Sequence, residues 1–354
     1  MELSKLLQLV IDKNASDLHL VPGYFPTIRV SGELYQMTTL ESVTPQISES
    51  LITSILNPEQ KESLSANREI DFAYGYSGYR FRTNAYYAQN YLCASFRLIQ
   101  AKILTIEQLS LPASIKQCVD LRQGLVLMTG PTGEGKSTTL AALVNEINNK
   151  YAKHIITIED PVEYIYPKSK SIVSQRELHQ DTHSWSVALK SALREDPDVI
   201  LVGEMRDFDT IQLALTAAET GHLVFSTVHT NSAPESIDRI IDIFPSNQQN
   251  QVKNQLSNVL KMVVTQRLLP KQGTISRVPA IEILFNSQAV SSTIREGKTY
   301  LLNNILETGE GEGQLLFEKH LLNLFKAGQI SKETAFSYAI RPKELERFIK
   351  IGRV

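Results

Sequence analysis

Hydrophobic residues in the first part of the chain follow the repeats of short helices and strands. An amphipathic helix is expected at the start, because apolar residues recur there every three or four positions, at Leu3, Leu6, Leu7, Val10 and Ile11. Short β-like segments such as Thr27–Val30 follow, broken by proline and glycine, and a second helix is expected near residues 47–56. This mixture predicts an N-terminal α+β domain.

Residues 72–91 are rich in aromatic side chains. Aromatic residues occur at every second position on either side of a Ser77–Gly78 turn, at Phe72, Tyr74, Tyr76, Tyr79 and Phe81. This spacing predicts two antiparallel strands. With Arg80 and Arg82 between them, the aromatics can also be interpreted as a stacking platform for single-stranded nucleic acid. We favour a sheet face, which is the commoner use of tyrosine-rich strands.

Four short apolar runs mark the second part of the chain, at residues 125–128, 154–158, 199–202 and 222–228. Helical stretches separate the runs, which predicts a parallel α/β sheet. Because 354 residues are too many for one compact core, we expect two domains as the default. The expected order is an N-terminal domain (1–105), a linker (106–121), an α/β core (122–288) and a C-terminal helical subdomain (289–354).

The first apolar run leads into Gly130–Ser137, which matches the phosphate-loop pattern GxxxxGK[ST]. Glycines let backbone N–H groups surround phosphates, Lys136 supplies a positive charge for the β- and γ-phosphates, and Ser137 offers a hydroxyl to Mg²⁺. A helix after the loop directs its positive end at the same anion. We therefore expect a nucleoside triphosphate to be bound by Gly130, Pro131, Thr132, Gly133, Glu134, Gly135, Lys136, Ser137 and Thr138.

Polar residues follow the other three runs and should meet the phosphates, since ligands of open α/β sheets bind at the carboxyl ends of strands. Glu204 is the candidate for Mg²⁺ binding and for polarising water as general base. Glu163 can position metal or water, with a helix-capping or surface acid as the alternative. His229 can donate a hydrogen bond to the γ-phosphate, whereas a structural role is equally open for His222.

Phosphoryl transfer also needs a cation for the charge that develops on the γ-phosphoryl oxygens. Arg82 and Arg97, on β-like segments of the first domain, are the candidates for a finger supplied by a neighbouring subunit. Solvated surface arginines are the alternative interpretation.

The composition argues against several classes of protein. A net charge of −2, from 36 basic and 38 acidic residues, gives no global signature of nucleic-acid binding. The two cysteines, Cys93 and Cys118, are too few and too far apart for a disulfide framework or a zinc site, which favours a reducing compartment. No apolar run approaches the roughly 18 residues that span a bilayer. We therefore expect a cytoplasmic protein.

Four motifs together resemble the type II/IV secretion ATPases: GPTGEGKSTTLAA, ITIEDPVEY, SALREDPDVILVGEMRD and LALTAAETGHLVFSTVHTNSA. In that family they are called the Walker A, Asp-box, Walker B and His-box motifs, and SDLHL at Ser16–Leu20 resembles the family's N-terminal domain. The resemblance implies a PAS-like N-terminal domain, a RecA-like P-loop ATPase core, and ATP with Mg²⁺ as cofactors. It also implies a homo-hexameric ring with sites between domains and neighbours, in which Arg82 and Arg97 reach the phosphates.

The pilus-retraction branch of the family is the most similar. Pilus-assembly and type II secretion relatives usually carry a long N-terminal extension and a four-cysteine metal motif, both absent from this sequence. The resemblance thus implies a twitching-motility motor, peripheral to the inner membrane at the pilus base. Its partners would be an inner-membrane platform protein and a second retraction ATPase.

Three differences from the family pattern keep alternatives open. Glu134 stands where serine is usual; its carboxylate should repel phosphate unless it points to solvent, so Glu134→Ser is expected to tighten ATP binding. Residues 289–298 retain only part of the retraction-associated pattern, and residues 309–314 replace the usual turn before the last helices. An accessory retraction ATPase or another secretion ATPase is the alternative within the family. A RecA-like nucleic-acid translocase is the alternative from a different class, and it predicts a basic stripe that this sequence lacks.

Overall fold

The computed structural model describes residues 1–30, 32–99, 102–274 and 276–351 and divides the chain into two compact units. Met1–Lys102 and Pro161–Ile165 form the first unit, and Ile103–Asp160 and Tyr166–Val354 form the second. Residues 352–354 of the expected C-terminal subdomain lie outside the described residues, as do residues 100–101 of the expected N-terminal domain.

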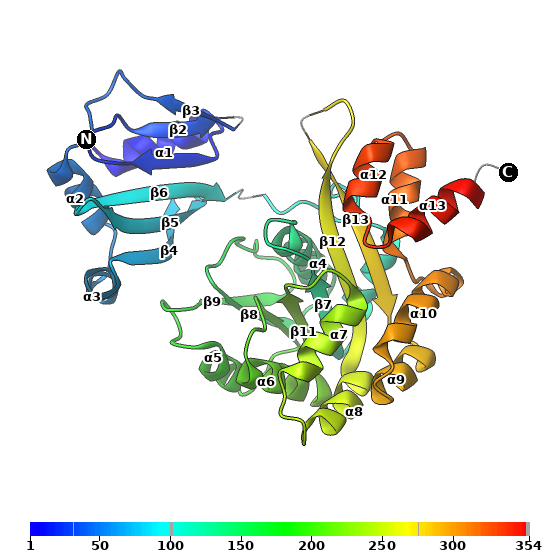
Figure 1. Cartoon of the computed structure of the whole chain (residues 1–354). Coiled ribbons are helices and arrows are strands. Elements are labelled where there is room, and N and C mark those ends of the chain that lie inside the picture. The colour runs from blue at the N-terminus through cyan, green and yellow to red at the C-terminus, as the bar shows by residue number, and fades with distance from the viewer. Residues whose placement is uncertain (31, 100–101, 275, 352–354) are drawn as a thin grey trace. The chain divides into compact units, whose positions relative to one another are not determined.

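The first unit is an antiparallel sheet with helices packed on it (Figure 1). Its described strands follow the order β3-β2-β1-β6-β5-β4, and each neighbouring pair is antiparallel. Its elements are α1 (Leu3–Asp12), β1 (Asp17–Leu20), β2 (Thr27–Val30), β3 (Glu33–Gln36), α2 (Pro45–Thr53), α3 (Pro58–Asn67), β4 (Glu69–Tyr76), β5 (Tyr79–Ala88) and β6 (Tyr91–Ile99). The N-terminal α+β prediction is thereby confirmed.

The aromatic segment forms the β4–β5 hairpin. Ser77 and Gly78 are the two turn residues, with φ of 50° and 79°, as a two-residue hairpin turn of the primed type requires. Phe72 and Phe81 are buried in the core of this unit, and Tyr74 packs partly against it. The aromatics therefore supply sheet faces, as the favoured interpretation predicted.

The second unit is built on a mostly parallel sheet whose described strands follow the order β13-β12-β7-β11-β10-β8-β9. Only the β12–β13 pair is antiparallel among them. The strands are β7 (Gly124–Thr129), β8 (His154–Glu159), β9 (Ile172–Glu177), β10 (Val199–Val202), β11 (Leu223–Val228), β12 (Leu260–Pro270) and β13 (Arg277–Phe285). All four predicted apolar runs are strands of this sheet, which confirms the α/β prediction.

Helices cover both faces of this sheet. Successive side chains of a strand point to opposite faces, and the apolar ones on each face are buried by helices. Leu125 and Leu127 of β7 pack on one face in the core that includes α5 to α10, whereas Val126 and Met128 pack on the other with η1 and α4. The helical elements are η1 (Ala113–Asp120), α4 (Lys136–Lys150), α5 (Trp185–Ala192), α6 (Phe208–Glu219), α7 (Ala233–Asp242), α8 (Gln249–Val259), α9 (Gln288–Arg295), η2 (Thr299–Leu301), α10 (Leu302–Thr308), η3 (Glu310–Glu312), α11 (Phe317–Lys326), α12 (Lys332–Tyr338) and α13 (Pro342–Ile351).

Residues 106–121, expected as a linker, belong instead to the second unit. Ile106, Ile115 and Cys118 are at most 1% exposed and lie in the core on the α4 face of the sheet. Burial of these apolar side chains makes the packed arrangement of residues 106–121 more stable than a solvent-exposed linker.

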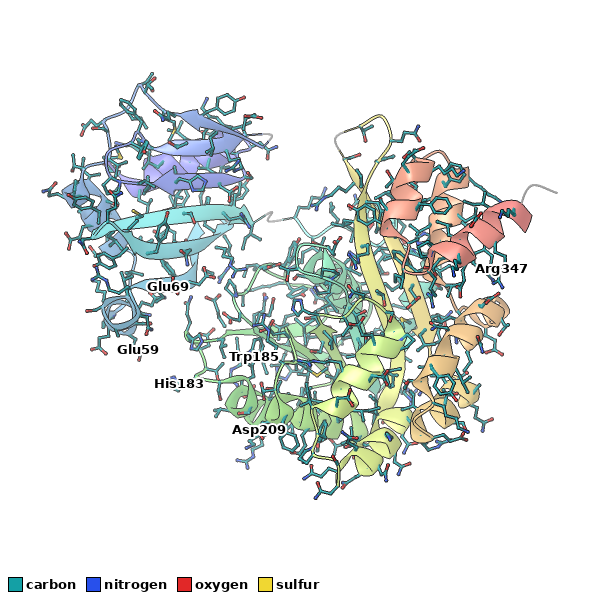
Figure 2. All side chains as sticks on the ribbon, viewed as in Figure 1. Glu59, Glu69, His183, Trp185, Asp209 and Arg347 are labelled. Atoms are coloured by element: carbon teal, nitrogen blue, oxygen red, sulfur yellow. The ribbon has the colours of Figure 1, made fainter. Side chains whose placement is uncertain are left out.

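The last helices are attached to the sheet in two ways. Helices α9 and α10 contribute to the large core on one face, while α11, α12 and α13 pack around the outer ends of β12 and β13. Figure 2 marks Arg347 on α13 and Trp185 at the start of α5. Within the described residues, no helix is both long enough and apolar enough to cross a membrane.

Candidate active site

The phosphate loop connects the end of β7 to the first turn of α4. Lys136 is 7% exposed, and its Nζ donates hydrogen bonds of 2.7 Å to the carbonyl oxygens of Gly130 and Pro131. Gly130 has φ of 137°, and a Cβ at that position would lie 2.4 Å from the carbonyl oxygen of Gln266. The loop therefore folds tightly around the ammonium group and leaves no room for a side chain at Gly130.

Strand β12 holds this loop from the side. Gln266 is 2% exposed; its Nε2 donates to the carbonyl oxygen of Glu134 at 2.6 Å, and its Oε1 accepts from the Thr139 hydroxyl at 2.7 Å. One residue earlier on β12, the hydroxyls of Thr265 and Thr129 are 2.9 Å apart and buried. Both polar groups of Gln266 are thus satisfied by the loop and by α4, which fixes the loop to the sheet.

From the sequence, the carboxylate of Glu134 is expected either to repel phosphate or to point into solvent. In the structure it does neither, because it points to β12. Its side chain is 17% exposed, and its Oε2 accepts a hydrogen bond of 2.5 Å from the backbone N–H of Leu268 on β12. Its Oε1 lies 4.0 Å from Nη1 of Arg267. The negative charge is therefore compensated on the β12 side of the loop, so the reason to expect tighter ATP binding in Glu134→Ser is lost.

Glu204 and His229 lie together at the ends of β10 and β11, as the sequence predicted. His229 Nε2 is 3.7 Å from Glu204 Oε2, and its Nδ1 is 3.5 Å from the hydroxyl of Thr132 in the phosphate loop. Glu204 Oε2 also forms an ion pair with Arg206 Nη2 at 2.8 Å. Burial lowers the pKa of His229, as does the Lys136 charge, and Glu204 opposes them. The imidazole is therefore biased toward its neutral form, in which one ring nitrogen donates and the other accepts.

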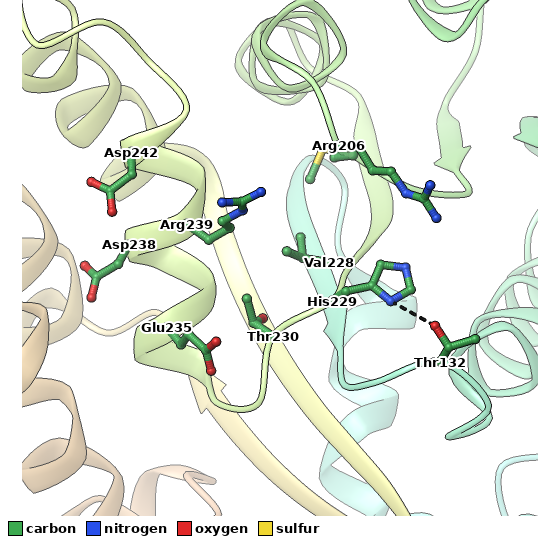
Figure 3. Close-up of a pocket in the computed structure, with 10 residues that line it drawn as sticks. Thr132, Arg206, Val228, His229, Thr230, Glu235, Asp238, Arg239 and Asp242 are labelled. Carbon is green, nitrogen blue, oxygen red and sulfur yellow. Dashed lines mark hydrogen bonds between the residues drawn. The ribbon is translucent and has the colours of Figure 1, made fainter.

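His229 and Thr132 border a cavity of about 660 Å³ (Figure 3). Thr132, Arg206 and His229 form one side of its lining, and Glu235, Asp238 and Asp242 project from α7. Burial raises the pKa of Asp238. The lining carries charges of both signs, from Arg206 and Arg239 and from the three carboxylates, so the cavity suits water and ions better than a purely apolar ligand.

A second hollow, of about 310 Å³, lies on the other side of the phosphate loop, beside Gly135 and Thr138. Its lining combines apolar side chains, among them Leu104, Leu111 and Leu268, with polar ones, among them Gln108, Lys271 and Arg277. A flat aromatic base attached to phosphates in the loop can be buried here.

The donors available to Mg²⁺ are the exposed Ser137 hydroxyl at the start of α4 and the Glu204 carboxylate. Both are hard oxygen ligands of the kind that Mg²⁺ prefers, and nucleotide sites usually complete the shell with phosphates and water. No group of three or more His, Cys, Asp or Glu residues suited to a metal occurs in the part of the chain that the structure describes. The residues fit a nucleotide-bound Mg²⁺ rather than a metal held by protein alone.

The remaining predicted site residues belong to other parts of the chain. Half-buried Glu163 is in the 161–165 segment of the first unit, so the second unit by itself assembles Glu204 and His229 but not Glu163. Arg82 pairs with Asp71 at 2.6 Å in the first unit. His222 lies within 2.9 Å of the Ala217 carbonyl oxygen at the start of β11, which is a structural role.

Arg97 also lies in the first unit, on β6. Its Nε donates to Asp17 Oδ1 at 2.9 Å, and its side chain is 71% exposed. Asp17 is buried, so this contact anchors the base of the guanidinium while most of the arginine side chain faces outward.

Sequence reasoning missed the contribution of β12. Its sequence, Leu260-Lys-Met-Val-Val-Thr-Gln-Arg267, is a fifth apolar run that ends in polar residues, the same signal that identified the other strand ends. Recognising it would have placed Thr265, Gln266 and Arg267 beside the phosphate loop.

Comparison with known proteins gives a consistent result. The family model described as Type II/IV secretion system protein matches residues 2–308. The type IV pilus retraction ATPase PilT of Pseudomonas aeruginosa is 44% identical over 344 residues, which cover 97% of this chain and 99% of that protein. The type IV pilus ATPase PilU of the same organism is 37% identical over 353 residues, with 99% and 92% covered. A crystal structure of the pilus retraction motor PilT with bound ADP has a TM-score of 0.92 and 42% identity, and covers 98% of this chain and 99% of its own.

Proposed function

This chain belongs to the type II/IV secretion ATPase family, and on that premise we propose that it is the motor of type IV pilus retraction. It is an ATPase of this family, with a P-loop nucleotide site. The observation that carries the proposal is its 44% identity, over nearly the full length of both chains, to a pilus retraction ATPase. The meeting of Thr132, His229 and Glu204 supports hydrolysis as the source of work.

In this proposal the side chains divide the chemistry of hydrolysis. Lys136 turns from the loop carbonyls toward the β- and γ-phosphates, and the loop amides surround the same anion. Glu204 accepts the proton of the attacking water, and neutral His229 donates a hydrogen bond at the γ-phosphate. Mg²⁺, held by Ser137 and Glu204, would neutralise charge on the phosphates. Glu163 would orient metal or water.

The assembly is the second part of the proposal. We infer a homo-hexameric ring in which Arg82 and Arg97 of one subunit face the phosphates bound by its neighbour. Arg97 suits this role, since Asp17 holds its Nε while most of the side chain is exposed. A cation supplied in this way would make hydrolysis depend on assembly and would move the first units during each cycle. The ring would act at the pilus base on an inner-membrane platform protein.

The chemistry can be tested with Glu204→Gln in the purified full chain. We expect hydrolysis to fall by orders of magnitude while a fluorescent ADP analogue still binds, because glutamine keeps the shape of the side chain but cannot accept the proton of water. Glu219→Gln is a matched control, since Glu219 lies on α6 and bonds to Gln255 instead. Turnover of Glu204→Gln near that of the control would reject the role of Glu204.

The shared site can be tested by mixing two inactive variants. Arg97→Ala subunits lack the finger, and Lys136→Ala subunits lack the phosphate contact. If the finger acts in trans, mixed rings contain some sites with both residues and recover part of the activity. No recovery at any mixing ratio would argue against a site shared between subunits.

The cellular role can be tested by deleting the gene and counting surface pili. Retraction predicts excess pili and lost twitching, whereas an assembly role predicts no pili. An accessory retraction role is the second candidate, favoured by 37% identity to PilU over 99% of this chain. It predicts that twitching persists in the deletion strain when another retraction ATPase is present.

A further inference from the structure

We propose that Arg267 is a positioning residue that sets the spacing between the phosphate loop and the His229 loop. The inference rests on the proposed function, because it takes hydrolysis with His229 at the γ-phosphate as given. It concerns three residues whose contacts connect the two loops: Glu134, Arg267 and Asn231.

The position of Arg267 follows from the alternation of side chains along β12. Gln266 points to the buried side of the strand, where it bonds to α4 and to the backbone of the phosphate loop. Its neighbour Arg267 therefore points to the other side, with 25% of its side chain exposed. On that side it reaches the loop that follows β11.

The guanidinium of Arg267 faces both loops at once. Its Nη2 donates a hydrogen bond of 2.7 Å to Asn231 Oδ1, two residues after His229. Its Nη1 lies 4.0 Å from Glu134 Oε1 in the phosphate loop. A planar guanidinium presents donors in a fixed fork, so these two contacts fix a geometry that a flexible ammonium group cannot reproduce.

Each end of this connection is itself anchored. Glu134 is tied to β12 by the N–H of Leu268 at 2.5 Å and by Gln266 at 2.6 Å. The N–H of Asn231 donates to Glu235 Oε2 on α7 at 2.8 Å. Both residues that Arg267 contacts are therefore held in place, so its side chain helps to fix the distance between the phosphate loop and the His229 loop.

The spacing matters because the contact of His229 with the phosphate loop is long, 3.5 Å to the Thr132 hydroxyl. A misplacement of about 1 Å at a reacting centre can lower a rate by about a hundredfold. Loss of Arg267 should therefore slow the chemical step and leave the phosphate contacts of the loop, and hence nucleotide affinity, in place.

The experiment compares kcat, KM and the affinity for a fluorescent ADP analogue in the full chain. Arg267→Ala, Asn231→Ala and the double variant are the tests, and Arg122→Ala, an exposed arginine before β7, is the matched control. We expect each single variant to lose kcat by roughly ten- to a hundredfold, with ADP affinity changed less than about threefold. The double variant should be no slower than the slower single variant, since both changes remove one connection.

Three outcomes would overturn the inference: unchanged kcat in either single variant, losses that multiply in the double variant, or a loss of ADP affinity as large as the loss of kcat. If Arg267→Ala does not fold, exposed Asn231 carries the test alone. His229→Ala separates this inference from the proposed function. If His229→Ala lowers kcat and Arg267→Ala does not, the positioning role fails alone; if His229→Ala has no effect, the proposed mechanism fails first.

Discussion

Arg341, at the start of α13, neutralises two carboxylates that are buried completely. Glu282 of β13 and Glu318 of α11 are 0% exposed, and their Oε2 atoms lie 2.8 and 2.9 Å from Arg341 Nη2. The backbone N–H of Arg341 also donates to Glu318 at 2.8 Å. The other oxygen of Glu282 accepts from the N–H of Ala233 at the start of α7. One guanidinium therefore connects the C-terminal helices, the sheet and α7.

Replacing Arg341 with methionine keeps much of the side-chain volume but leaves both carboxylates without their cation. Removing one partner of a buried ion pair typically costs about 3–5 kcal/mol. For a unit of this size, roughly 2–4 °C of melting temperature are lost per kcal/mol. We therefore expect Arg341→Met to lower the melting temperature of the second unit by about 6–20 °C.

The single tryptophan of the chain, Trp185, packs against the main core of the second unit and reports its unfolding by fluorescence. Arg347→Met is the matched control on the same helix, because Arg347 is 49% exposed where it pairs with Glu307 (Figure 2). An exposed pair of this kind contributes about 0–1 kcal/mol. At 2–4 °C per kcal/mol, a melting temperature for Arg341→Met within about 2 °C of that control would mean a loss of no more than about 1 kcal/mol, which would refute the reasoning.

The pH dependence of the same variant gives an independent check. Burial raises the pKa of Glu318, and Arg341 opposes that rise. Without Arg341 the pKa in the folded state rises further above that of the unfolded chain, so protonation favours the folded variant. The deficit of Arg341→Met should therefore shrink as the pH falls from about 8 to about 5. A deficit that grows over this range would contradict the assignment.

Two further predictions concern a buried histidine and the glycines of the phosphate loop. Burial lowers the pKa of His320 to about 4, so the unfolded chain takes up a proton at a higher pH than the folded chain does. Up to about 3 kcal/mol of folding stability is therefore lost between pH 6.5 and 4. His320→Gln should flatten this dependence of stability on pH in denaturant unfolding, and an unchanged slope would count against the role of His320. Gly130→Ala should abolish binding of a fluorescent ADP analogue, because the added Cβ meets Gln266. Gly133→Ala, with φ of 83° but nothing within 4 Å, should lose affinity by no more than about thirtyfold, the upper limit for a strain of about 1–2 kcal/mol. Equal losses in both variants would show that the close approach is unimportant.

The parts of the fold that sequence predicted are those set by local patterns. Buried parallel strands appear as short apolar runs, and the polar residues after them meet because parallel strands end at the same edge. This reasoning predicted that Glu204 and His229 lie at neighbouring strand ends, where His229 contacts both Glu204 and Thr132 of the phosphate loop. It also predicted the Ser77–Gly78 turn, since positive φ angles there follow from local turn chemistry.

The parts that sequence did not predict depend on contacts between distant residues. No local pattern indicates that Glu134 accepts from the N–H of Leu268, which is 134 residues away. The same is true of residues 106–121, whose apolar side chains are compatible with a linker or with a core until their partners are known. Glu163 follows a core strand along the chain, yet its segment belongs to the first unit.

The attachment of β12 to the phosphate loop also has a consequence for how the protein matures. The hydrogen bonds between the loop region and Thr265 or Gln266 join residues 127 to 136 positions apart. At synthesis rates of 5–20 residues per second, the loop waits on the order of ten seconds for the strand that fixes it. A ligand that binds only the folded site stabilises that fold, so we expect ATP to favour the form in which β12 has joined the sheet. The ligand that drives the motor thus also favours completion of its fold.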